Sequence, residues 1–200
     1  IYILSGVSQN TPEDVMRGEE TQLAGYFMDN SNFSGSICLP GTHSKWVNVK
    51  NYEILNFNTY LTGELYEIVK DYSVLKHSLL THEISEIKLI QGVDTILKNP
   101  NNFSNELFQL RAKDLLKNQS SIDSNSLLSG YFLGLELLGS KSYWYKKDVI
   151  LIGSEFLNRC YWLCLNKEVN SIKSFTSEEM TLKGLNYFKN NLNLDKLMSS

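Results

Sequence analysis

The sequence predicts an α/β domain built on a mixed sheet, with a helical insertion between the two halves of the sheet. Three neighbouring strand patterns with short links, at residues 36–40, 45–49 and 52–60, are typical of an antiparallel meander. Near the end of the chain, a β-branched run at 148–153 is followed by a glycine turn, a helical pattern, a strand at 171–175 and a last helix. This order is typical of a parallel pair of strands in an α/β unit.

The first 34 residues precede the meander. "IYILSGV" at 1–7 reads as a strand that ends in a glycine turn, "QNTPEDVMR" at 9–17 predicts a polar turn region, and residues 18–28 predict a helix. The chain starts with isoleucine and shows no basic segment followed by a long apolar one, as a signal peptide would. We therefore expect the chain to be the C-terminal portion of something longer.

Four helical patterns separate the two halves of the sheet, at residues 62–72, 84–99, 104–118 and 124–140. Ser104 and Ser124 are expected to be N-caps. The longest apolar stretch, 127–138, is too short to span a membrane and contains Glu136. Its Gly130 and Gly134 predict a face where two helices pack closely. After the last strand, "TSEE" at 176–179 predicts a capping box for the final helix.

Composition limits the function classes. The chain has 200 residues, 42% of them hydrophobic, and a formal net charge of −3. These values fit one ordinary domain or one lobe of a two-lobed protein, and they predict no basic face for nucleic acid. The three cysteines, Cys38, Cys160 and Cys164, form no C-x-x-C pattern, so we expect buried free thiols in a reducing cytosol and no metal site.

"PGTHSKW" at 40–46 is the first candidate site. Gly41 can take a positive φ, successive amides of such a turn can bind an anion, and Thr42 and Ser44 add hydroxyl donors. Lys45 adds a positive charge, and His43 could donate to an anion. The turn therefore has the groups that bind a phosphate. On spacing alone, a polar hairpin turn without a ligand is an equally good interpretation.

Two other patterns are less specific. "MRGEETQ" at 16–22 places Glu19 and Glu20 in the first turn of a helix, beside Arg17. The helix dipole favours carboxylates there, so a structural role competes with a catalytic one. "LIGSEFL" at 151–157 places Gly153 and Ser154 between a strand and a helix, which is a common platform for nucleotides or phosphates.

Taken together and in this order, six segments closely resemble the 2-dehydro-3-deoxygalactonokinase family. They are "DVMRGEETQLAG", "LPGTHSKWV", "FNTYLTGELYEIV", "LFQLRA", "LLSGYFLGLEL" and "VILIGSEFLNRCY". The family is in the sugar-kinase branch of the actin/hexokinase/Hsp70 superfamily. The resemblance implies a ribonuclease H-like lobe with helices on both faces of the sheet. It also implies ATP and Mg²⁺ as cofactors, a cytoplasmic location, and phosphorylation of the 6-hydroxyl of 2-dehydro-3-deoxy-D-galactonate in D-galactonate breakdown.

The resemblance also implies roles for individual residues. The hairpin at 39–46 is similar to the superfamily's second phosphate loop, and the turn at 153–154 is similar to its adenosine motif. Glu19 or Glu20 would accept the hydroxyl proton; Glu19 is preferred because it directly follows the glycine. Arg17 would bind the substrate carboxylate or the transferred phosphoryl group. The residues expected at the phosphates are Gly41, Thr42, His43, Ser44 and Lys45, and those at the nucleoside are Gly153 and Ser154.

One motif of the superfamily is missing. Its first phosphate loop, a D-x-G-x-T pattern, does not occur in the chain. We therefore expect residues 1–34 to end an N-terminal lobe and include a connecting helix, and residues 35–200 to form the C-terminal nucleotide-binding lobe. Two alternatives stay open: a truncated, non-catalytic nucleotide-binding relative, and a kinase of another sugar acid. The expected partners are ATP and a sugar acid, not nucleic acid or a membrane; a homodimer through the helices at 84–118 is left open.

Overall fold

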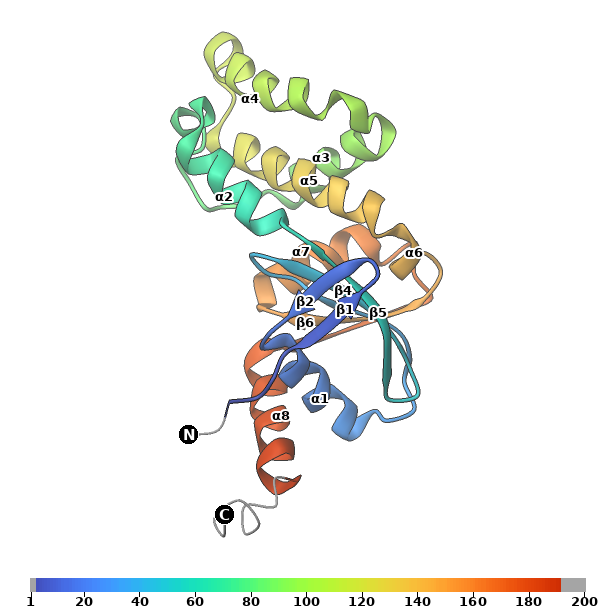
Figure 1. Cartoon of the computed structure of the whole chain (residues 1–200). Coiled ribbons are helices and arrows are strands. Elements are labelled where there is room, and N and C mark those ends of the chain that lie inside the picture. Colours follow the sequence, from blue (N-terminus) through green and yellow to red (C-terminus); the bar gives the residue numbers. More distant parts are fainter. Residues whose placement is uncertain (1–2, 192–200) are drawn as a thin grey trace.

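The computed structural model describes residues 3–191, and a five-stranded mixed sheet lies at its centre (Figure 1). The strand order is β5-β4-β3-β6-β7. Strands β3 (Ser34–Leu39), β4 (Ser44–Lys50) and β5 (Glu53–Tyr60) are antiparallel neighbours, which confirms the predicted meander. Strands β6 (Asp148–Gly153) and β7 (Ser171–Thr176) run parallel to β3, which confirms the predicted parallel pair.

Helices cover both faces of this sheet (Figure 1). Helices α1 (Glu19–Asp29) and α8 (Ser177–Asn191) lie against one face, and α5 (Ser121–Gly139), the short α6 (Lys141–Trp144) and α7 (Glu155–Leu165) lie towards the other. Burial on both faces explains why the sequence of β6 is apolar throughout and does not alternate with polar residues. Val149, Ile150, Leu151 and Ile152 are each at most 3% exposed.

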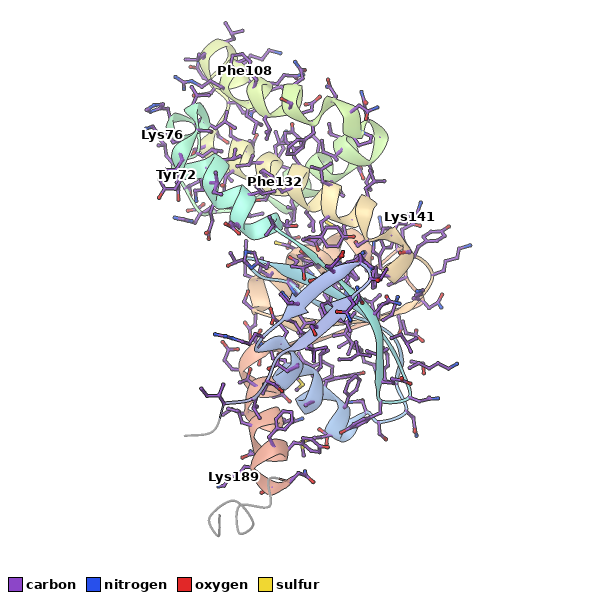
Figure 2. All side chains as sticks on the ribbon, in the orientation of Figure 1. Tyr72, Lys76, Phe108, Phe132, Lys141 and Lys189 are labelled. Atoms are coloured by element: carbon purple, nitrogen blue, oxygen red, sulfur yellow. The ribbon has the colours of Figure 1, made fainter. Side chains whose placement is uncertain are left out.

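The helical insertion stands beyond one end of the sheet (Figure 1). It contains α2 (Thr62–Tyr72), the 3₁₀ turns η1 (Val74–His77) and η2 (Pro100–Asn102), α3 (Glu86–Lys98), α4 (Phe103–Lys117) and most of α5. A Cβ on Gly130 would lie 2.3 Å from the Leu89 carbonyl oxygen, and one on Gly134 would lie 3.0 Å from Ile96 Cβ. The predicted close packing of the two helices is therefore confirmed, between α3 and α5. Figure 2 shows Phe132 among these helices and Phe108 on their outer side.

Both predicted serine caps in this insertion are wrong. Helix α4 starts at Phe103, one residue before Ser104, because the 3₁₀ turn η2 leads directly into it. Helix α5 starts at Ser121, and the Ser120 hydroxyl accepts a hydrogen bond of 3.1 Å from the Asp123 amide. Ser124 is fully buried inside the helix, where it accepts a hydrogen bond from the Gln119 side chain. The earlier serine takes the cap and extends the helix by one turn.

The strand predicted at the start of the chain is also wrong. Residues 3–6 form no strand, and residues 1–2 lie outside the described part. The segment expected to be a turn region forms a hairpin of β1 (Val7–Asn10) and β2 (Glu13–Met16) around a cis Thr11–Pro12 bond. Its polar side chains bind the edge strand β5. The Asp14 carboxylate accepts from the Thr59 amide at 2.6 Å, and Gln9 exchanges two hydrogen bonds with the Phe57 backbone.

Two smaller predictions can also be compared with the structure. The Thr176 hydroxyl accepts a hydrogen bond from the Glu179 amide at 3.3 Å, as the capping-box pattern predicts. Cys38 and Cys160 are buried and Cys164 is partly buried, each as a free thiol. Over residues 3–191, no helix combines the length and the apolar character that crossing a membrane requires.

Candidate active site

Strand β4 sends two neighbouring residues of the predicted phosphate turn to opposite faces of the sheet. Side chains alternate along a strand, so Lys45 and Val47 face α1 and α8, whereas Ser44 and Trp46 face α5 and α7. Both Ser44 and Lys45 are buried, at 1% and 4% exposure. The turn therefore contributes to two different cavities, and the two residues cannot share one role.

Lys45 forms an ion pair with Glu19 on the α1 face. Its Nζ lies 3.1 Å from Glu19 Oε1, and the side chains are 5% and 25% exposed. Gly18, directly before the helix, has a φ of 114°, a conformation that favours glycine. The chain reversal at Gly18 lets the Arg17 amide donate to Glu19 Oε2 at 3.1 Å. One carboxylate thus links the start of α1 to the start of β4.

Glu20 has a different environment. Its Oε2 accepts a hydrogen bond of 2.6 Å from the Gly18 amide, and its Oε1 accepts one of 3.3 Å from the Thr21 hydroxyl. Both partners belong to the start of the same helix, where free amides favour a carboxylate. The structural role that the helix dipole predicts therefore describes Glu20, while Glu19 reaches across to the sheet.

A cavity of about 380 Å³ opens beside the Glu19–Lys45 pair. It brings together residues that the sequence singled out in two separate motifs, at 16–22 and 40–46. Its lining includes Arg17, Gly18, Glu19, Gln22, Pro40, Gly41, Thr42 and His43, with Ile152 and Ser177 from the ends of β6 and the start of α8. Glu20, Ser44 and Lys45 are not among the lining residues; Lys45 lies behind Glu19, with which it is paired.

The expected conformation of Gly41 is wrong in one respect. Of the glycines in residues 3–191, Gly18 has a positive φ and Gly41 does not. A Cβ on Gly41 would meet nothing nearer than the His43 carbonyl oxygen, at 4.0 Å. The space beside Gly41, not an unusual backbone angle, leaves its peptide open to a ligand.

The first turn of α2 packs against this loop. The Glu64 amide donates to the Thr42 carbonyl at 3.0 Å, and the Glu64 carboxylate lies 2.5 Å from His43 Nε2. A Cβ on Gly63 would lie 2.6 Å from the Gly41 carbonyl oxygen, so the helix touches the loop backbone directly. His43 is about half exposed, and its Nε2 is the ring nitrogen that contacts Glu64.

A second cavity, of about 440 Å³, lies on the other face of β4. Its walls are mainly apolar and come from the loop, from helices α2, α3, α5 and α7, and from the segment before α3. The lining residues include Gly41, Ser44, Thr62, Gly63, Tyr66, His82, Leu89, Ser129, Phe132, Leu133, Phe156, Leu157, Cys160 and Tyr161. Its size and character suit a nucleoside.

Gly153 and Ser154 shape this cavity indirectly. The Ser154 hydroxyl caps α7 by accepting from the Leu157 amide at 3.2 Å, and Gly153 packs against Pro40. Neither residue lines the cavity, but the helix that they start presents Phe156 and Leu157 to it. Sequence reasoning missed the lining side chains because their contacts join segments that are far apart in the chain.

Glu136 is a buried carboxylate between the two cavities' shared loop and the helices α5 and α7. It is 1% exposed, and its carboxylate accepts hydrogen bonds from Trp46 Nε1, the Tyr161 hydroxyl and the Thr62 hydroxyl. Burial raises the pKa of the Glu136 carboxyl above its usual range, and these hydrogen bonds act in the opposite direction. The single signal in the sequence was a charged residue inside a long apolar run, which requires partners when buried.

Within residues 3–191, no cluster of three or more His, Cys, Asp or Glu residues could hold a metal ion.

Comparison with known proteins now decides the family. The model of the family described as 2-keto-3-deoxy-galactonokinase matches residues 1–188 of the chain. The chain belongs to this family. Within the galactonokinase family, a curated relative from Rhizobium meliloti (strain 1021), named a probable 2-dehydro-3-deoxygalactonokinase, is 34% identical over 191 residues. The 2-dehydro-3-deoxygalactonokinase of Escherichia coli (strain K12) is 33% identical over 145 residues, or 72% of this chain.

A solved structure agrees with this assignment. The crystal structure of a Sinorhizobium meliloti protein with a provisional 2-dehydro-3-deoxygalactonokinase name matches 94% of this chain with a TM-score of 0.86 and 30% identity. The chain spans 65% of that protein, 62% of the Rhizobium meliloti relative and 49% of the Escherichia coli enzyme. The galactonokinase fold is therefore shared over nearly all of this chain and over about half to two thirds of its relatives.

Proposed function

We propose that the protein carrying this chain transfers the γ-phosphoryl group of ATP to the 6-hydroxyl of 2-dehydro-3-deoxy-D-galactonate, in D-galactonate breakdown. Family membership and the names of the two curated relatives support the reaction and the substrate. The observation that carries the proposal is the Glu19–Lys45 pair, which joins a carboxylate at a helix start to the predicted phosphate loop.

Glu19 is the proposed proton acceptor. Phosphoryl transfer relies mostly on positioning and on stabilisation of charge, together with a carboxylate that takes the hydroxyl proton. Glu19 lines the same cavity as the loop residues Gly41, Thr42 and His43, so it can lie between a sugar hydroxyl and a γ-phosphate. Glu20 is bound to its own helix start and is the weaker candidate.

Lys45 and Arg17 would carry the positive charge of the site. When nucleotide binds, the Lys45 ammonium would contact phosphate oxygens and release Glu19 for its role as base. Arg17 lines the same cavity, and its planar guanidinium can bind the substrate carboxylate with two hydrogen bonds. The amides and hydroxyl of the turn at 41–43 would bind the β- and γ-phosphates. Ser44 faces the other cavity, so its backbone, not its hydroxyl, would serve the phosphates.

The second cavity would hold the nucleoside. It lies on the other side of the same loop, and its apolar walls, with Phe156 and Phe132, suit a nucleobase. Oxygen ligands suit Mg²⁺, and the nucleotide phosphates would supply them, since Glu19 is the proposed base. Bound magnesium would neutralise charge on the phosphates. We also propose that residues 35–200, described here to 191, form the ribonuclease H-like nucleotide lobe, and that residues 1–34 end the other lobe and include the connecting helix.

A coupled assay of ADP release tests the proposal on the intact protein. The panel would contain 2-dehydro-3-deoxy-D-galactonate, 2-dehydro-3-deoxy-D-gluconate and D-galactonate, each with ATP and Mg²⁺. We expect the highest kcat/KM for the first acid. A higher value for another acid would overturn the substrate assignment, and the absence of ADP release with every acid would overturn the kinase assignment.

A further inference from the structure

We infer that Glu136 is a positioning residue for the phosphate loop, and that it couples the loop to the nucleoside cavity through Tyr161 and Thr62. This inference rests on the proposed function, because it assigns Glu136 a part in nucleotide binding. The carboxylate belongs to α5, at the end of the helical insertion, and it contacts neither of the two cavities directly.

The first connection runs through Tyr161. The Tyr161 hydroxyl lies 2.8 Å from both Glu136 oxygens and 2.9 Å from the Ser44 hydroxyl. A tyrosine hydroxyl has one proton and a carboxylate can only accept, so Tyr161 donates to Glu136 and accepts from Ser44. Ser44 is the residue where the loop enters β4. The chain of hydrogen bonds from Ser44 to Tyr161 to Glu136 therefore determines the position of the C-terminal end of the loop.

The second connection runs through Thr62, the first residue of α2. Its hydroxyl donates to Glu136 Oε2, and the next two residues contact the other part of the loop. Gly63 lies against the Gly41 and Thr42 backbone, and the Glu64 amide donates to the Thr42 carbonyl at 3.0 Å. One buried carboxylate thus restrains both ends of the loop, and it lies beside the positive end of the α2 dipole.

The chemistry of the cluster favours a structural anion over a second catalytic site. The groups that form hydrogen bonds with Glu136 donate to it: an indole N–H and two hydroxyls. Hydrogen bonds to an ionised acceptor are stronger than neutral ones and have sharper geometry. Tyr161 also lines the nucleoside cavity, so movement there would reach the loop through this hydroxyl.

The test compares binding of ATP and of adenosine to the intact protein by titration calorimetry. Glu136→Gln replaces one acceptor oxygen by a donor, and Tyr161→Phe removes the hydroxyl but keeps the ring. We expect each variant to raise the Kd for ATP about tenfold and the Kd for adenosine less than about twofold. The double variant should lose little beyond either single one, because both changes break the same connection.

Tyr131→Phe is the matched control. Tyr131 is buried, at 1% exposure against 3% for Tyr161, and its hydroxyl donates to a glutamate, Glu106, at 3.3 Å, but it lies within the helical insertion. Its removal should leave both Kd values unchanged. Equal loss of ATP and adenosine affinity in Tyr161→Phe, or no loss of either, would overturn the positioning role alone. Absence of ATP binding by the unsubstituted protein would overturn the proposed function and this inference with it. Should Glu136→Gln not fold, Tyr161→Phe decides the test.

Discussion

Lys45 and Glu19 form an ion pair, with Nζ and Oε1 3.1 Å apart, across the junction between the sheet and α1. The lysine side chain is almost completely buried and the glutamate is a quarter exposed. Of the two, Glu19 lines the cavity. This contact connects the two sequence motifs that resemble the galactonokinase family most specifically. It also gives the two carboxylates of "GEE" separate environments.

Replacing Lys45 tests the charge at the phosphate loop. Lys45→Ala should weaken ATP binding about 10- to 100-fold, because a buried ammonium is removed from beside the phosphates. Lys50→Ala, at the exposed far end of the same strand, is the control and should bind ATP normally. Calorimetric titration with ATP provides the measurement. An ATP affinity equal to that of the control variant would remove Lys45 from the phosphate site.

Replacing Gly63 tests the contact between α2 and the loop. In Gly63→Ala, the new Cβ would lie 2.6 Å from the Gly41 carbonyl oxygen and 2.7 Å from Thr42 Cα, so the loop backbone must move. We expect the Kd for ATP to rise at least fivefold. Gly134→Ala, which crowds α3 instead, should lower the melting temperature without changing the Kd of the folded protein. The idea fails if both variants bind ATP like the unsubstituted protein.

The buried Glu136 predicts a pH dependence of stability. Its pKa in the folded protein lies above the ordinary value of 4.5, so the folded state binds more protons than the unfolded state between the two values. The free energy of unfolding contributed by this group therefore falls as the pH rises from about 4.5 through the raised pKa. Glu136→Gln does not titrate and should lack this loss.

Thermal unfolding of both proteins between pH 4.5 and 8 measures this effect. The melting temperature of Glu136→Gln, relative to that of the unsubstituted protein, should rise as the pH increases. Parallel profiles over the whole range would show that the carboxyl has the same pKa in the folded and unfolded states, contrary to its burial.

The local pattern of apolar and polar residues was sufficient to predict much of this fold. Helix α2 has the predicted bounds, 62–72, and the β3–β4 hairpin and the strand β6 lie where the apolar runs place them. These segments carry their signal in neighbouring residues: alternation, β-branched runs and helical spacing. The hairpin of β1 and β2 could not be predicted in this way. Its strands are polar because Gln9 and Asp14 bind the edge of β5, more than 40 residues away.

The candidate site also contains residues that local motifs predict and residues that only long-range packing brings together. The sequence placed Glu19, Gly41 and Lys45 as candidates, since each belongs to a short motif. It could not show that Ser44 and Lys45 serve opposite faces, although the alternation of a strand requires it once the strand begins at Ser44. Glu136 and Tyr161 belong to no motif. They meet because α5 and α7 pack on the same face of the sheet, which is a long-range consequence of the fold.

Glu19→Gln in the intact protein tests the central claim most directly. The amide keeps the size of the side chain but cannot accept the proton, so kcat for ADP release with 2-dehydro-3-deoxy-D-galactonate should fall about 10²–10⁴-fold. The Kd for ATP should change little. Glu53→Gln, which alters an exposed carboxylate at the start of β5, should keep normal kcat. A kcat for Glu19→Gln equal to that of the unsubstituted protein would contradict the account and leave the proton acceptor to another group.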